Sequence, residues 1–279
     1  MAVNPVLSKE IRQRFHSYKA ALIVAGYLLA LGSFILGFIY LNWQHRPGYF
    51  QPGQNREIFI MLVLAQFALL CFVVPGLTAG LISGEREKQT LNVLLTTRLS
   101  CRSIVTGKLA AACLFFVLLL SASLPLYSMV SLYGGFAPGQ TAAAFGIYLL
   151  SMYLYGALGM ACSVFFQRTG VSTVATYGIA FFLSVCTGLL AIFFYQFLQP
   201  PGGYAGGLPP YIVRLLLAIN PGAVLTAILE PRANLPFGNL GLPYWLIYTL
   251  FCLGLGTVLL AYSSYALNPL RRRGVRFWR

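Results

Sequence analysis

The chain has 279 residues, of which 58% are hydrophobic and only 9% are charged, and its mean hydropathy is +0.77. In soluble proteins about a quarter of all residues are charged, so this composition excludes an ordinary soluble domain. The formal net charge of +14 raises the possibility of a nucleic-acid-binding protein, and the distribution of that charge decides against it below.

Six apolar runs are long enough to cross a bilayer as helices, which takes about 20 residues each. Backbone groups cannot remain unpaired in lipid, so long apolar runs predict helices rather than strands. The predicted spans are 20–41, 58–82, 108–133, 143–166, 174–198 and 243–267. The sequence therefore predicts an all-α membrane protein with six transmembrane helices, organised as a single transmembrane domain over residues 1–279.

The segment before the first span, residues 1–19, is predicted to form an amphipathic elbow helix in the membrane interface. Apolar side chains recur there at helical spacing, with basic side chains on the other faces. The residues assigned to it are Leu7, Lys9, Glu10, Ile11, Arg12 and Phe15. The pattern fits a simple interfacial anchor and also a helix that touches a partner on the same side.

The second span contains Pro75-Gly76 near its end. Proline removes a backbone donor and clashes with the preceding turn, so a kink is expected there. A functional hinge and a tolerated membrane proline both fit this pattern.

A charged segment, residues 83–100, follows this span and begins a predicted cytoplasmic coupling loop over 83–105. Ser83 is expected to cap a short helix with Glu85 and Glu87 in its first turn, and Ser100 to cap the next helix. Leu91, Leu94 and Leu95 would form an apolar ridge on the short helix. An apolar ridge with charged flanks suits a groove on another protein; a solvated connector is the alternative.

The last outer loop, residues 199–242, has proline- and glycine-rich ends around the apolar stretch Tyr211–Leu229, which is broken at Asn220-Pro221-Gly222. Each half is too short to span, which predicts two re-entrant or surface helices. Two full crossings would leave the tail on the same side, so charge alone does not exclude them. The basic tail, 268–279, is expected to anchor at the lipid headgroups.

The basic residues are distributed unevenly between the two sides of this predicted topology. All but four of the 19 lysines and arginines fall in the expected inner segments, and the four are Arg46, Arg56, Arg214 and Arg232. This positive-inside bias predicts that both termini are cytoplasmic. The positive charge therefore reflects topology, and we expect no nucleic-acid partner.

Enzyme and metal chemistry lack the residues that they need. The six cysteines show no metal-ligand spacing, and the two histidines, His16 and His45, are expected on opposite sides of the membrane. Gly107-Lys108 is not a phosphate-binding loop, because Arg102 stands where the first glycine belongs and Leu109 follows. The spans hold almost no ionisable residues away from their ends, which disfavours an ion-coupled carrier.

The charged segment and its surroundings resemble the membrane subunits (permeases) of ABC-2 type ABC transporters. The resemblance covers nearly the whole chain, and its specific part runs from Glu85 to Lys108. The matching positions are Asn4-Pro5-Val6-Leu7-x-Lys9-Glu10, Pro75, Gly84-Glu85-Arg86-Glu87-x-x-Thr90-Leu91-x-x-Leu94-Leu95-x-Thr97-x-Leu99-Ser100, Ile104 and Gly107-Lys108. Gln89 and Arg98 depart from the glycine and proline usual in the family.

The resemblance implies that the first inner loop couples the chain to a separate cytoplasmic ATPase. The coupling residues would be Glu85, Arg86, Glu87, Lys88, Thr90, Leu91, Leu94, Leu95, Thr97 and Arg98. It further implies two ATPase copies that hold ATP and Mg²⁺, a second permease, a location in the bacterial cytoplasmic membrane, and export. The absence of charge in the spans suggests an amphipathic, lipid-like or peptide cargo. A non-transporting membrane scaffold and a secondary carrier remain alternatives.

Overall fold

The fold consists of long helices that cross a bilayer. The computed structural model describes residues 10–12, 18–45, 52–91, 100–132, 138–198, 211–229 and 243–267, and within these ranges it contains helices and no strand. Six helical segments are long and apolar enough to span a membrane: Ala20–Gly37, Arg56–Glu87, Cys101–Val130, Pro138–Phe165, Thr169–Phe197 and Tyr244–Ala266. The predicted all-α membrane fold with six spans is confirmed.

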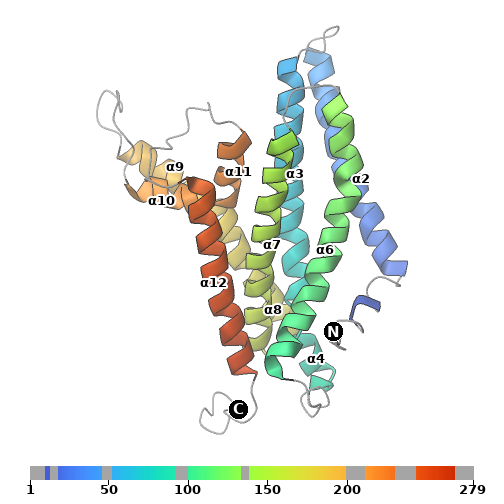
Figure 1. The fold of residues 1–279 in the computed structure, drawn as a ribbon, viewed down its shortest axis with the longest axis vertical. Coiled ribbons are helices and arrows are strands. Elements are labelled where there is room, and N and C mark those ends of the chain that lie inside the picture. Colours follow the sequence, from blue (N-terminus) through green and yellow to red (C-terminus); the bar gives the residue numbers. More distant parts are fainter. Residues whose placement is uncertain are drawn as a thin grey trace.

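Five long helices form most of the bundle, together with a fifth span of three helical segments and several short helices. The long helices are α2 (Tyr18–His45), α3 (Pro52–Thr78), α6 (Cys101–Leu132), α7 (Pro138–Phe165) and α12 (Tyr244–Ala266). The fifth span comprises α8 (Thr169–Phe181), the π-helical turn η1 (Phe182–Cys186) and α9 (Thr187–Phe197). The short helices are α4 (Ser83–Glu87), α10 (Tyr211–Ile219) and α11 (Pro221–Leu229). In Figure 1, α4 lies at one end of the bundle, here called the α4 end, and α10 and α11 lie toward the other.

Helix α7 is the centre of the bundle and contacts α3, α6, α8, α11 and α12. Its largest buried side chains include Tyr148 and Tyr155, whose hydroxyls have partners. Tyr148 donates to the carbonyl of Val63 at 2.8 Å, and the Tyr155 hydroxyl lies 2.6 Å from Ser184 Oγ. Hydroxyls inside a membrane domain need such partners, because no water is there to replace them.

A glycine brings α7 close to the end of α3. A Cβ atom on Gly159 would overlap the side chain of Thr78 and lie 3.2 Å from the backbone nitrogen of Ala79. Small residues allow helices to approach in this way within membranes. The contact places the end of α3, and with it α4, directly against α7.

Replacing Gly159 with alanine is expected to destabilise the protein by about 1–3 kcal/mol, because the added methyl group forces the backbone of α3 away from α7. Gly146, on the same helix, has no atom within 4 Å of its added Cβ. The Gly146→Ala control should therefore be neutral or gain up to about 1 kcal/mol in helix propensity. Thermal unfolding in detergent measures both; equal melting temperatures would contradict the close contact.

Helices α10 and α11 meet at 92° across Asn220, and the break is held by that side chain. The Asn220 amide donates to the carbonyl of Ser184 and to the hydroxyl of Thr187, each at 2.8 Å. Its oxygen accepts the N–H of Ala223 at 2.9 Å, which caps α11. The two predicted short helices are present, and Asn220 between them binds the π-helical turn of the fifth span.

Candidate functional site

The charged segment begins at a turn that α7 supports. The backbone N–H groups of Ile82 and Ser83 donate to the hydroxyl of Ser163 in α7 at 2.8 and 2.9 Å. Ser83 was expected to cap α4, and this is wrong: its side chain makes no cap bond, and its hydroxyl donates back to the carbonyl of Ala79 at 3.2 Å. The cap comes from Ser163 instead, since the turn at residues 79–82 already lies against α7.

Helix α4 ends at Glu87, earlier than the sequence predicted. Gln89 has a φ of 58°, a left-handed conformation that a right-handed helix cannot continue and that glycine adopts most easily. Gln89 is also the position at which the ABC-2 resemblance has glycine. Beyond it, Leu91 is buried against Ile82, Ile104 and neighbouring side chains. Leu91 thus packs within this chain and is not part of an exposed ridge continuous with α4.

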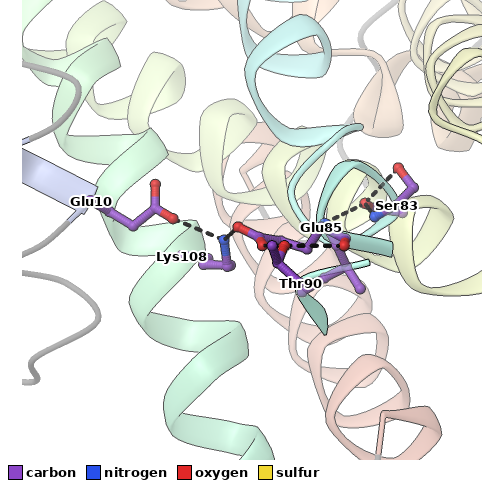
Figure 2. A network of polar contacts seen from close by, with 7 residues as sticks. Glu10, Ser83, Glu85, Thr90 and Lys108 are labelled. Carbon is purple, nitrogen blue, oxygen red and sulfur yellow. Dashed lines mark hydrogen bonds and ion pairs between the residues drawn. The ribbon is translucent and has the colours of Figure 1, made fainter. Parts of the chain in front are cut away.

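Glu85 belongs to a buried ion-pair cluster that joins three parts of the chain (Figure 2). Lys108 of α6 is only 3% exposed, and its Nζ lies 2.8 Å from Glu10 Oε1 and 3.1 Å from Glu85 Oε1. The second oxygen of Glu85 accepts the hydroxyl of Thr90. Burying an unpaired lysine is costly, and the two carboxylates offset that cost. The cluster therefore fixes the residue-10 segment, α4 and α6 relative to one another.

The next two residues bind the turn between α7 and α8. Arg86 donates to the carbonyls of Phe166 and Val164, at 3.1 and 3.2 Å, at the end of α7. Glu87 accepts the backbone N–H and the hydroxyl of Thr169, at 2.7 and 2.8 Å, at the start of α8. Each charge suits its helix end, because a cation is favoured at a helix C-terminus and an anion at an N-terminus. Consecutive side chains of α4 thus bind different helices.

The remaining predicted coupling and elbow residues include exposed, half-buried and undescribed positions. Lys88 and Thr90 are exposed. Of the predicted elbow residues, Glu10, Ile11 and Arg12 are helical, with Arg12 exposed. The structure's described ranges do not include Leu7, Lys9, Phe15, Leu94, Leu95, Thr97 and Arg98.

The predicted hinge at Pro75-Gly76 lies inside α3 and receives a side chain from α8. The hydroxyl of Tyr177 donates to the carbonyl of Phe72 at 2.8 Å. A Cβ atom on Gly76 would lie 2.8 Å from that hydroxyl, so the glycine makes room for it. Pro75 and Gly76 thus lie where Tyr177 of α8 packs against α3. Hinge motion at these residues stays a prediction.

Sequence reasoning assigned no role to Lys108, Ser163 or Thr169. Lys108 carried a usable signal: it is a charge at the edge of an apolar run, in a chain with only five acidic residues to pair with it. Thr169 carried a weaker signal, because it is the first residue of an apolar run that follows Arg168. Ser163 had none, since a serine within a span commonly bonds its own helix.

The charged side chains of the site make contacts between helices. The described residues contain no group of three or more histidine, cysteine or acidic side chains that would hold a metal ion. Glu85, Arg86 and Glu87 each bind another part of the bundle. These contacts connect α4 to α6, to the turn between α7 and α8, and to the segment of Glu10.

These features define a multi-pass helical membrane protein whose charged inter-span segment is fastened to several helices. The model of a family described as ABC-2 family transporter protein matches residues 5–263. The chain belongs to this family and is thus a membrane permease component of an ABC transporter, which implies partnership with an ABC ATPase subunit. No curated protein matches the chain.

Proposed function

We propose that this permease serves an ATP-driven exporter and that a separate cytoplasmic ATPase docks on residues 83–100. The observation that carries the proposal is the attachment of Glu85, Arg86 and Glu87 to different helices of the bundle, while Lys88 beside them is exposed. A partner that pushed on the exposed side would displace the helices bound to the other side. A simple connector between two spans needs no such attachments.

The proposed topology places the α4 end and both termini in the cytoplasm of a bacterial cell, with α10 and α11 near the outer face of the cytoplasmic membrane. The uneven distribution of lysine and arginine supports this orientation. The position of α10 and α11 away from the α4 end is consistent with it (Figure 1). ATP and Mg²⁺ would bind the partner subunits, in two copies, and a second permease, identical or homologous, would complete the transporter.

The proposed cargo is an amphipathic or lipid-like molecule or an apolar peptide. Among the described residues, the buried side chains of the bundle are mostly apolar, aromatic and hydroxyl-bearing, with the amides of Gln66 and Asn220. The buried charged side chains among them are Lys108, near the start of α6, and Arg214, in α10. A small hydrophilic ion would find little to replace its hydration in the middle of such a bundle.

The test is affinity purification of the tagged chain from its native membrane in mild detergent. We expect a stoichiometric ATPase with a phosphate-binding loop to co-purify, and a Leu94→Asp/Leu95→Asp variant to lose it at least tenfold while inserting normally. The matched control is Gln167→Asp, which adds a carboxylate at an exposed position of the same end. Recovery of the wild-type chain without an ATPase, where a known complex survives, would favour a scaffold.

A further inference from the structure

We propose that Arg86 and Glu87 are positioning residues that clamp the α7–α8 turn to α4, so that the inner half of the fifth span moves with the ATPase-docking segment. The inference rests on the proposed function, because it needs an ATPase to move that segment. It goes further by naming the span that receives the motion and the side chains that deliver it.

The contact between Glu87 and Thr169 replaces a cap that α8 does not have. Arg168, which precedes α8, makes no capping bond with its own side chain. The carboxylate of Glu87 supplies that bond from 82 residues away, accepting both the backbone N–H and the hydroxyl of Thr169. Charge-assisted bonds to both groups are short and directional. Displacing α4 therefore pulls directly on the first residue of α8.

Several further contacts bind the same two segments. Arg86 holds the last carbonyls of α7, and the hydroxyl of Ser172 in α8 donates to the carbonyl of Ala79 at 2.7 Å. A Cβ atom on Gly80 would lie 3.2 Å from the Thr169 methyl group, so the backbone at Gly80 packs closely on the Thr169 side chain. The end of α3, α4 and the α7–α8 turn consequently form one rigid unit.

The fifth span is built to move in response. In its apolar window 17% of the residues are buried, as in the first span, against 83% in Pro138–Phe165. Val174 on α8 is 74% exposed. The π-helical turn Phe182–Cys186 follows α8 and interrupts the regular hydrogen-bond pattern, as π-helical turns at functional sites often do. A rigid link at one end of α8 and an irregular turn at the other allow α8 to swing while α9 stays with α10.

The sharpest variant breaks the clamp from the α8 side, outside the proposed docking segment 83–100. Thr169→Pro removes both donors to Glu87 and leaves α4 intact. Proline is favoured at the first position of a helix, and Arg168 already has the extended conformation (φ −98°, ψ 133°) that a residue before proline requires. Glu87→Gln is the second variant and removes the charge from the other side. Gly170→Ala, at a neighbouring position with no atom within 4 Å, is the control.

The measurement is the distance between spin labels at Val174 on α8 and Val258 on α12, in the permease–ATPase complex in lipid nanodiscs with the native cysteines replaced. Both positions are exposed. Wild type and Gly170→Ala should show a shift between the nucleotide-free and ATP-trapped states. Thr169→Pro and Glu87→Gln should both lose at least half of that shift. Thr169→Pro, which lies outside the docking segment, should also retain the bound ATPase and its hydrolysis of ATP.

Three results would overturn the proposal, and they differ in what they leave standing. A full shift in both variants would show that Glu87 joins α4 to the α7–α8 turn without transmitting motion. The proposed function as a transporter would remain intact. Loss of the ATPase from Thr169→Pro would make the turn a docking surface rather than a clamp. Failure of the wild-type chain to bind an ATPase or to respond to ATP would remove the proposed function and this inference together.

Discussion

Replacing Lys108 with methionine is expected to lower the stability of the protein by about 2–3 kcal/mol. Methionine has a similar length, so little packing is lost, but Glu10 and Glu85 would face each other without the cation between them. Removing one member of a buried ion pair costs about 3–5 kcal/mol. The lower figure applies here because the side chain of Glu85 is 31% exposed and that of Glu10 is 16% exposed, so water screens part of the repulsion.

Thermal unfolding in detergent should show this loss as a fall of about 5–10 °C in apparent melting temperature. Trypsin should also cleave faster after Arg12, because Glu10 is no longer held. The control is Arg102→Met on the same helix, where the side chain is exposed. Adding Glu85→Gln to Lys108→Met should restore part of the stability. An unchanged melting temperature in Lys108→Met would rule out the cluster as a structural element.

Replacing Asn220 with alanine is expected to cost about 2 kcal/mol and to loosen the π-helical turn of the fifth span. The variant loses two buried bonds, to Ser184 and Thr187, and the cap on Ala223. A hydrogen bond between membrane helices contributes about 0.6 kcal/mol on average, and a cap about 1 kcal/mol. The loss should appear as faster amide exchange in residues 182–186, since the Asn220 amide holds the carbonyl of Ser184.

Asn220→Ser separates the two roles of this side chain. Serine caps helices as well as asparagine does, but it is too short to reach the fifth span. Its amide exchange at 182–186 should therefore match that of Asn220→Ala, while its melting temperature should lie between those of alanine and wild type. Gly188→Ala gives an independent test, because its Cβ would lie 3.1 Å from the Asn220 amide nitrogen. Wild-type exchange in all three variants would contradict the contact.

The six spans were predictable because each is a long apolar run, and the bilayer leaves such a run few alternatives. The ends of the helices were not. The third span was predicted to start at Lys108, whereas α6 begins at Cys101. In a hydropathy pattern, a charged residue marks the end of an apolar run. Lys108 nevertheless lies buried within α6, because the carboxylates of Glu10 and Glu85 pair with it. The π-helical turn in the fifth span left no pattern that we could read, and its Ser184 carbonyl is bound by Asn220 from far along the chain.

The charged segment was located from the sequence, but the partners of its side chains were not. Glu85 and Glu87 were expected to favour the start of their own helix. Glu87 instead caps α8 and Glu85 pairs with Lys108. Tertiary contacts decide which of several compatible helix ends a carboxylate binds. The resemblance indicated one local feature correctly. Glycine is usual where this chain has Gln89, and Gln89 has a positive φ.

The central position of α7 determines how the lipid bilayer can act on this protein. The peripheral helix α2 has 28 residues and α12 has 23, which correspond to lengths of about 42 and 35 Å. Both exceed the hydrocarbon thickness of about 30 Å, so they meet a thinner or thicker bilayer by changing their tilt. Helix α7, enclosed by its neighbours, has little surface on which lipid can press. Changes in membrane thickness should therefore alter the tilt of α2 and α12 while the orientation of α7 stays the same.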